Sequence, residues 1–168
     1  MPIRGKKLLP SSFATMQIFV DDYSNSILKG RIYHLASRKL MSFLGIYDFL
    51  NKLEGVYNKF SFPQATHEFR TFRKSSFPVS DMGNTAENYE DMEVKTKVKK
   101  EKEVKIEPSA KGTFIIRVLY RQNATWQGNI QWVEGKKAQN FRSDLEMLKL
   151  MDDALRTNDE ENDEVKWE

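Results

Sequence analysis

Two stretches of the chain repeat one residue pattern at a constant offset of 98 positions. The offset relates Gly30 to Gly128 and Phe43 to Phe141, and it holds without a gap through strand-like and helix-like segments. Two copies of one module must share a topology, and each must bury its own apolar face, so the repeat limits the fold more than any other feature. The other matched pairs are Ile18 and Ile116, Val20 and Val118, Asn25 and Asn123, Ile32 and Ile130, Lys39 and Lys137, and Leu50 and Leu148.

The first copy has the pattern of three strands followed by a helix. Apolar and polar residues alternate over residues 16–20 and 28–33, as in strands with one buried face. The turn-rich residues 22–26 separate these strands, and a third strand is expected around residues 40–44. The period then changes to helical spacing, and the expected apolar stripe is Ile46, Phe49, Leu50, Leu53 and Tyr57.

The second copy predicts the same order of elements. Gly135 indicates a tight hairpin over residues 134–137, because glycine adopts a positive φ at little cost. Ser143 and Glu146 form a capping box at the start of a helix that is expected to bury Met147 and Leu155. In the first strand of this copy we expect Phe114, Ile116, Val118 and Tyr120 on one face, and Ile115, Arg117, Leu119 and Arg121 on the other.

These patterns predict an α+β protein with a tandem β-β-β-α repeat. One such unit leaves apolar surface uncovered, so the two are expected to form an intramolecular pseudo-dimer with antiparallel sheets and one helix per repeat. The expected segments are a basic N-terminal arm (residues 1–15), repeat 1 (16–57), an aromatic and basic stretch followed by a charged linker (58–112), repeat 2 (113–157) and an acidic tail (158–168).

The segment between the repeats has two parts. Five Phe residues interleave with Arg and Lys over residues 60–77, which favours packing against the sheet or a helix, with nucleic-acid contact as the alternative. Residues 81–108 are rich in Lys and Glu and are interpreted as a mobile linker, with an extra strand around residues 94–106 as the alternative.

Composition excludes several classes of function. The chain has no cysteine and only two histidines, His34 and His67, so we expect no disulfide, no metal site and no cofactor. Nucleophile-elbow, phosphate-loop and dinucleotide-binding motifs are absent, which predicts that the protein is not an enzyme. No segment reaches the roughly 20 apolar residues of a membrane span, so we expect a soluble, cytoplasmic protein with no membrane partner.

Charge is distributed unevenly along the chain. The formal net charge is +3, but the residues after Thr157 carry a net of −5, so the rest of the chain carries +8. A basic body is compatible with an anionic partner, and the acidic tail would compete with that partner for its binding site. The alternative is that the tail serves only solubility.

The outward strand faces are the expected binding surface. Arg can contact phosphate, Gln and Asn can contact base edges, and aromatic rings can stack on bases. Ordinary solvent-facing strand residues are the alternative interpretation, with Phe19 and Tyr33 packed under the middle segment. The candidate nucleic-acid-binding residues are Phe19, Lys29, Arg31, Tyr33, Arg117, Arg121, Gln127, Asn129 and Gln131.

Residues near the second helix suggest a smaller site. Arg142 precedes the helix N-terminus, where exposed N–H groups attract anions, and Gln122 and Trp126 are expected close to it as a possible anion or nucleotide site. Trp126 and Trp132 share the face of Ile130, which favours burial in the core over stacking on a sugar or base.

In element order, and in the Gly-Arg-Ile-Tyr run at residues 30–33, the chain resembles single-strand-binding families built from sheet-then-helix units. These are the PUR repeats, the Whirly domains and, more loosely, the fold of positive cofactor 4. The resemblance is one of architecture and implies binding of single-stranded nucleic acid on the sheet face.

The sequence therefore predicts a non-enzymatic binding module for single-stranded nucleic acid or a nucleotide, acting as a monomer or homodimer. A protein-interaction adaptor and a sensor of a small anionic nucleotide are the alternatives.

Overall fold

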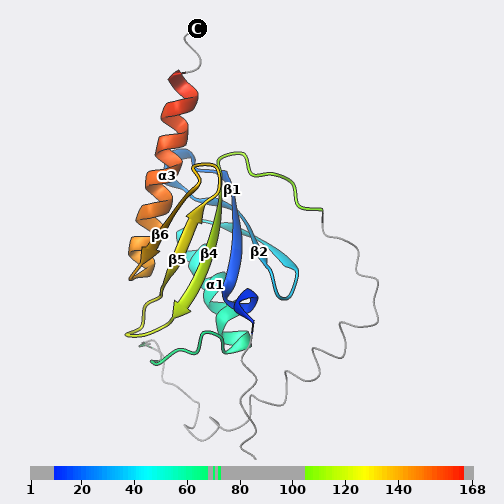
Figure 1. Cartoon of the computed structure of the whole chain (residues 1–168), viewed down its shortest axis with the longest axis vertical. Coiled ribbons are helices and arrows are strands. Elements are labelled where there is room, and N and C mark those ends of the chain that lie inside the picture. The colour runs from blue at the N-terminus through cyan, green and yellow to red at the C-terminus, as the bar shows by residue number, and fades with distance from the viewer. Residues whose placement is uncertain (1–9, 68–69, 71, 73–104, 165–168) are drawn as a thin grey trace, which may run out of the picture. The chain divides into compact units, whose positions relative to one another are not determined.

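The computed structural model describes residues 10–67, 70, 72 and 105–164, with side chains as far as residue 159. The chain divides into two units, residues 1–67 with 106–168 and residues 68–105, and every element named below belongs to the first. This unit has an α+β fold, in which a six-stranded antiparallel sheet carries two α-helices on one side (Figure 1).

The elements follow the order expected from the sequence. A 3-10 helix η1 (Ser11–Ala14) leads into β1 (Thr15–Asp22), η2 (Ser24–Ser26), β2 (Lys29–His34), β3 (Lys39–Leu44) and α1 (Ile46–Phe60). The later elements are β4 (Gly112–Tyr120), β5 (Gln127–Trp132), β6 (Lys137–Phe141) and α3 (Asp144–Glu164). The strand order in the sheet is β3-β2-β1-β4-β5-β6.

The antiparallel pairing of β1 with β4 lies at the centre of this sheet. Gln17 faces Ile115, with Met16 opposite Ile116 and Ile18 opposite Phe114. Each strand would otherwise be an edge with unpaired N–H and C=O groups, so the pairing satisfies both edges at once. One continuous sheet results from two groups of three strands.

The core lies between the helices and one face of the sheet. Apolar residues at every second strand position meet the apolar stripes of α1 and α3, which follow helical spacing. Full burial of each large apolar side chain contributes about 1.5–3 kcal/mol. The largest fully buried side chains include Met16, Ile18, Ile32, Phe114 and Ile116 from the strands, and Phe49, Leu53, Tyr57, Met147, Met151 and Leu155 from the helices.

The offset of 98 positions also relates backbone features. Six of the positive-φ residues form three pairs with nearly equal angles, including Asn25 (55°) with Asn123 (56°) and Arg38 (52°) with Lys136 (51°), whereas Ser61 and Gly45 have no such counterpart. The β1–β2 ladder has a bulge between residues 20 and 22, and the β4–β5 ladder has one between residues 118 and 120. The first backbone hydrogen bond of each helix is also equivalent. The N–H of Phe49 donates to the carbonyl of Gly45, and the N–H of Met147 donates to the carbonyl of Ser143, both at 3.0 Å.

The bulge in β4 makes one predicted alternation wrong. Leu119 is the extra residue, so Val118 and Tyr120 no longer share a face, and Tyr120 is exposed rather than buried. Arg121, expected on the outward face, turns to the helix side and is only 4% exposed. After a bulge, residues that the alternation places on one face of the sheet lie on the other, and nothing in the local composition marks the position of the bulge.

Two local predictions are corrected in detail. Lys136, not Gly135, has the positive φ in the β5–β6 turn. Gly135 is needed for space, because a Cβ there would collide with the ring of Trp132. In the capping box, the Ser143 hydroxyl accepts the Glu146 N–H at 3.1 Å as expected, but the Glu146 carboxylate accepts the N–H of Arg142 rather than that of Ser143.

The helix α3 runs to Glu164, past the boundary expected at residue 157. No glycine or proline interrupts the sequence there, so the helix has no stop signal. The predictions for residues 1–9, for residues 68, 69, 71 and 73–77 of the aromatic stretch, for residues 78–104 and for the last four residues lie outside the described residues. Within the described parts of the chain, neither α-helix is long and apolar enough to cross a membrane.

His34 is a buried histidine held in its neutral form. Its Nε2 lies 3.0 Å from the carbonyl oxygen of Phe13, which can only accept, so Nε2 carries the hydrogen. Nδ1 then accepts from the Ser37 hydroxyl at 2.7 Å, and the ring packs against Phe60 with centroids 5.0 Å apart. Burial lowers the pKa of His34, and the charge of Lys59 lowers it further.

The glycines at the second position of β2 and of β5 should not tolerate a side chain. A Cβ at Gly30 or Gly128 would collide with a backbone carbonyl on the neighbouring strand and lie 3.0 Å from a phenylalanine ring. We expect Gly30→Ala and Gly128→Ala each to lower the free energy of unfolding by about 1–3 kcal/mol, measured by urea denaturation. Gly55→Ala is the matched control: with no atom within 4 Å and a helical position, it should raise stability by about 0.5–1 kcal/mol. Equal effects at all three sites would contradict the packing described here.

Stability should decrease below pH 6.5 because of His34. The unfolded chain takes up a proton with an ordinary pKa of about 6.5, whereas the folded form, with its lowered pKa, stays neutral to lower pH. The unfolded state therefore binds more protons below that pH, and stability rises with pH and levels off above about 6.5. Urea unfolding measured at several pH values below and above 6.5 should show this increase of the free energy of unfolding with pH in the wild type. The control His67→Ala, at an exposed position, should show the same increase. The increase should be smaller in His34→Gln, and an unchanged increase would exclude His34 as its source.

Candidate functional site

The sheet face opposite α1 and α3, here called the open face, carries the candidate binding residues. Strand register arranges its side chains in three rows, with neighbouring strands about 4.8 Å apart. The central row is Leu40, Tyr33, Gln17, Ile115, Gln131 and Ala138. The first flank is Ser42, Arg31, Phe19 and Thr113, and the second flank is Thr15, Arg117, Asn129 and Asn140.

The first flank is occupied by internal contacts. Arg31 forms two hydrogen bonds with the Asp21 carboxylate, both at 2.8 Å, and this pairing raises the pKa of the guanidinium. The same guanidinium donates to the carbonyl oxygens of Glu107 (3.0 Å) and Pro108 (3.2 Å), and its carbon lies 5.2 Å from the centre of the Phe19 ring. Phe19 is 6% exposed, so neither residue has a free group to offer a ligand.

The second flank keeps its polar groups available. Arg117 is exposed and forms no hydrogen bond or ion pair with any residue that the structure describes. Asn129 lies beside Arg117 on β5 and donates to the Asn140 side chain at 3.1 Å and to the Gln139 carbonyl at 3.2 Å. This flank can accept an anion at Arg117 and hydrogen-bonding groups at the two amides.

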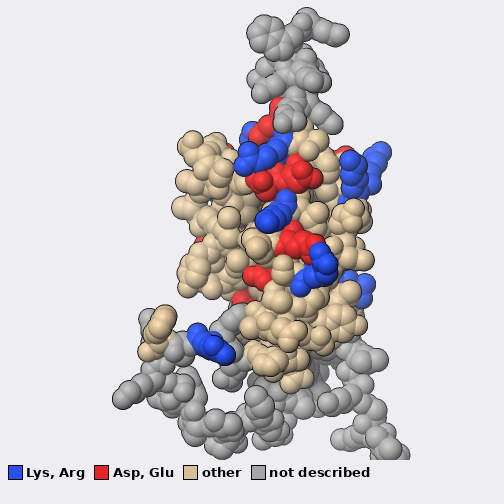
Figure 2. Space-filling view, turned by 90° about the vertical axis from the view of Figure 1, so that its left-hand side faces the viewer, with Lys and Arg blue, Asp and Glu red and all other residues tan. Residues whose placement is uncertain are grey.

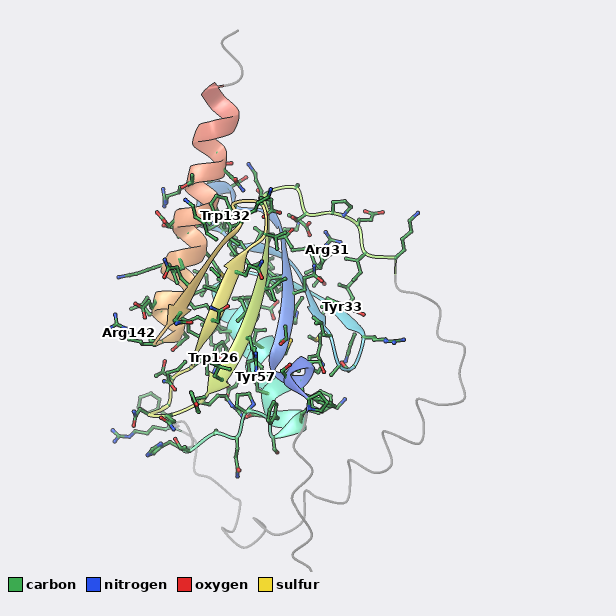
Figure 3. All side chains as sticks on the ribbon, in the orientation of Figure 1. Arg31, Tyr33, Tyr57, Trp126, Trp132 and Arg142 are labelled. Carbon is green, nitrogen blue, oxygen red and sulfur yellow. The ribbon has the colours of Figure 1, made fainter. Side chains whose placement is uncertain are left out.

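The central row joins the two flanks. Tyr33 and Gln17 are half-buried neighbours, and Gln131 is exposed on β5. Lys29 lies at the start of β2, exposed and opposite Leu44. Figure 3 shows Arg31 and Tyr33 together on the β2 side of the sheet.

Gln127, another predicted binding residue, is used to hold its own hairpin. Its side chain accepts the N–H of Gln122 at 3.2 Å and donates to the carbonyl of Gln122 at 3.2 Å. Longer contacts reach the carbonyls of Thr125 and Arg142, both at 3.4 Å. Gln127 therefore fixes the turn after β4 rather than presenting a free amide.

Arg121 belongs to a buried polar network on the helix side, not to the open face. Its Nη1 lies 2.9 Å from Glu54 and 2.7 Å from Asn58, both on α1, and its Nε donates to the carbonyl of Pro63 at 2.6 Å. The second oxygen of Glu54 accepts the indole N–H of Trp126 at 2.8 Å. This network ties α1 to β4 and β5, and the sequence missed it because the bulge reverses Arg121.

Tyr57 lies against this network. Its ring is 5.8 Å from the Arg121 guanidinium carbon and packs edge-on against Trp126. Its hydroxyl is buried without a hydrogen-bond partner among the described residues. Burial raises the pKa of this hydroxyl well above its usual value, so Tyr57 stays neutral.

The three residues of the predicted anion or nucleotide site differ in exposure and in their contacts. Arg142 forms an i,i+4 ion pair with Glu146 at 3.0 Å, which raises the pKa of Arg142 and cancels its charge at the helix N-terminus. Trp126 is 5% exposed, as the preference for core burial predicted, and the backbone N–H of Gln122 donates to Gln127. The Gln122 and Arg142 side chains are exposed, so Trp126 is the member of the predicted site that is withdrawn into the core.

The side that α3 lines has mixed charge and one small cavity. Figure 2 shows acidic and basic side chains interspersed there, unlike a surface that attracts polyanions. A cavity of about 270 Å³ lies between α3 and β6, with Trp132 and Leu150 on its apolar side and Lys137 and Asp153 at its rim. The Trp132 indole nitrogen is buried there without a partner in the described chain. Because water scarcely reaches this atom, it does not offer a donor to a ligand.

Comparison with protein-family models, with curated proteins and with solved structures finds no match. Functional conclusions therefore depend on the geometry of the site alone.

The buried ion pair should matter far more to stability than the exposed one. Arg121→Ala leaves Glu54 without its partner in a site where Arg121 is 4% and Glu54 18% exposed, so we expect a loss of about 3–5 kcal/mol in the free energy of unfolding. The matched control Arg142→Ala removes a pair whose Arg side chain is 89% exposed and should cost less than about 1 kcal/mol. Chemical denaturation of both variants measures the difference, and similar losses would rule out a special role for the network.

Proposed function

We propose that the chain is a non-enzymatic binding protein for single-stranded nucleic acid, built from two copies of one β-β-β-α unit, and that the open face is its binding surface. The observation that carries the proposal is the open face itself: a sheet surface that neither α1 nor α3 covers, with an exposed arginine beside side-chain amides.

The duplication is supported by the shared offset. Paired positive-φ residues, paired bulges and paired helix starts all differ by 98 positions. The β1–β4 register is symmetric under the same offset. If each residue is replaced by its partner 98 positions away, the Met16–Ile116 pair becomes the Phe114–Ile18 pair, which is also observed, and the Gln17–Ile115 pair becomes itself. An isologous interface between two identical subunits has this property.

The preference for nucleic acid is supported by the chemistry of the three rows. They contain no acidic side chain, and the nearby Asp21 is neutralised by Arg31. Arg117 offers a charge for phosphate, Gln17 and Gln131 offer amides for base edges, and Tyr33 offers an aromatic ring. Rows of side chains about 5 Å apart across strands suit an extended strand better than a compact ligand.

A protein partner is the second candidate, and one observation favours it. Leu44 is 65% exposed, Tyr47 80%, Ile46 43% and Ile27 51%, and the bond from the Gly45 N–H to the Leu28 carbonyl brings these residues to one corner of the sheet. Exposed apolar residues gathered in this way mark protein interaction sites. Here the corner would recruit another chain, and the open face would be a passive surface.

Binding should depend on salt and on Arg117. We expect fluorescence anisotropy to show that the full chain binds a fluorescein-labelled single-stranded oligonucleotide of mixed sequence. The logarithm of the association constant should fall linearly with the logarithm of the salt concentration between about 50 and about 200 mM. Arg117→Glu should weaken binding about tenfold and reduce the magnitude of the salt slope by about 1, because one phosphate contact is lost.

The control for this experiment is Lys149→Glu, which makes the same charge change at an exposed position on α3 and should leave binding nearly unchanged. Absence of binding at low salt would defeat the proposal. Self-association that Tyr47→Ser abolishes would then support the protein-partner function.

A further inference from the structure

The two halves of the open face are not equivalent, although their strands are. The offset of 98 positions relates Phe19 to Arg117, Arg31 to Asn129, Tyr33 to Gln131 and Ser42 to Asn140. In the first half these positions hold residues 107 and 108 in place and bury a phenyl ring. In the second half the same positions carry an arginine and three amides on an exposed surface.

Hydrogen bonding fixes the orientation of the Asn129–Asn140 pair. The Gln139 carbonyl only accepts, so the Nδ2 group of Asn129 must face it, and the second hydrogen of that group goes to the Oδ1 of Asn140. The Oδ1 of Asn129 and the Nδ2 of Asn140 remain without partners among the described residues. The pair therefore presents one acceptor beside one donor in a fixed arrangement.

Gln131 presents the same combination a short distance away. It lies two residues from Asn129 on β5, on the same face, which corresponds to about 7 Å along a strand. Its side chain is exposed and forms no hydrogen bond with the described residues. The second half thus has two neighbouring sites, each with one donor and one acceptor, and Arg117 beside them.

We infer that this amide patch, formed by Asn129, Gln131 and Asn140, gives the open face a preference for adenine bases in single-stranded nucleic acid. Adenine places its N6 donor between two acceptors, so it shows a donor beside an acceptor on both its Watson–Crick edge (N1) and its Hoogsteen edge (N7), and a carboxamide binds the N6/N7 edge with two hydrogen bonds. Cytosine and thymine show this combination on one edge only, and the Hoogsteen edge of guanine shows two acceptors. Arg117 supplies the phosphate contact that holds the strand over the patch. The inference rests on the proposed function and names the base that the same face selects.

The experiment compares affinities of the full chain for labelled oligo(dA), oligo(dC) and oligo(dT) of equal length at one salt concentration. We expect oligo(dA) to bind about tenfold more tightly than the two pyrimidine strands. A purine-deoxyriboside strand, which stacks like oligo(dA) but lacks the N6 amino group, should bind like the pyrimidine strands. A 7-deazaadenine strand, which lacks N7, should show a smaller loss if both edges are read.

The matching protein variant is Asn129→Leu with Gln131→Met and Asn140→Leu, which removes all three carboxamides of the patch while nearly keeping side-chain size. We expect the preference for oligo(dA) to fall below about twofold while the salt slope stays that of the wild type, since Arg117 is untouched. Gln139→Met is the control, because it removes an exposed amide on the opposite side of β6, and it should keep the preference.

The outcomes separate the two proposals. Equal affinity of the wild type for all three strands, with the expected salt dependence, overturns the adenine preference and leaves single-strand binding standing. Retention of the preference by the triple variant, or by the strand that lacks the N6 amino group, also overturns it. Failure to bind any strand at low salt overturns both proposals.

Discussion

The pairing of β1 with β4 is the interaction on which the rest of the structure depends. It joins two groups of three strands into one sheet and brings α1 and α3 onto the same side, so that a single core lies beneath both. Without it, each group would have an unpaired edge and an apolar face covered by only one helix. The Arg121–Glu54 pair adds to this connection, since it ties the helix of one group to strands of the other.

A symmetric framework with unequal surfaces explains how the site is built. Positions that must fit the framework keep their residues, and the clearest case is the pair of glycines at 30 and 128, where a neighbouring backbone leaves no room for a Cβ. Positions that point to the open face are free of this constraint and differ between the two groups of strands, with Arg31 in one and Asn129 at the corresponding place in the other. One half therefore holds a segment of the chain itself, and the other half leaves Arg117 and Gln131 exposed.

Element order could be predicted from the sequence because it depends on short-range patterns. Each strand or helix with one buried face has its own apolar period. The alternation around Ile18 and Ile116 therefore identifies strands, and the helical spacing from Phe49 to Tyr57 identifies a helix, without knowledge of distant contacts. The strand partner across the centre of the sheet was not visible in this way, because pairing between Gln17 and Ile115 depends on residues far apart in the chain.

The candidate site could be predicted only in part. Arg117, Asn129 and Gln131 follow the simple alternation and lie on the open face, whereas Arg121 follows a bulge that composition does not reveal. Alternation predicts the face to which a side chain points, but not whether its polar groups are free to bind a ligand. Arg31 and Gln127 lie on the expected face, but they form hydrogen bonds with other parts of the chain. Such bonds are decided by tertiary structure and by loop geometry.

The long separation between the two central strands also affects how the protein is made. Hairpins within each half join residues close in sequence and can form early, but the β1–β4 ladder closes a loop of about 98 residues and must wait for the second half to be synthesised. Until then the first half has a bare strand edge and a partly covered core. Two ribosome-bound chains at that stage would expose identical strand edges to each other. Exchange of halves between molecules would then compete with correct folding, most strongly where synthesis is fast and the nascent chains are close together.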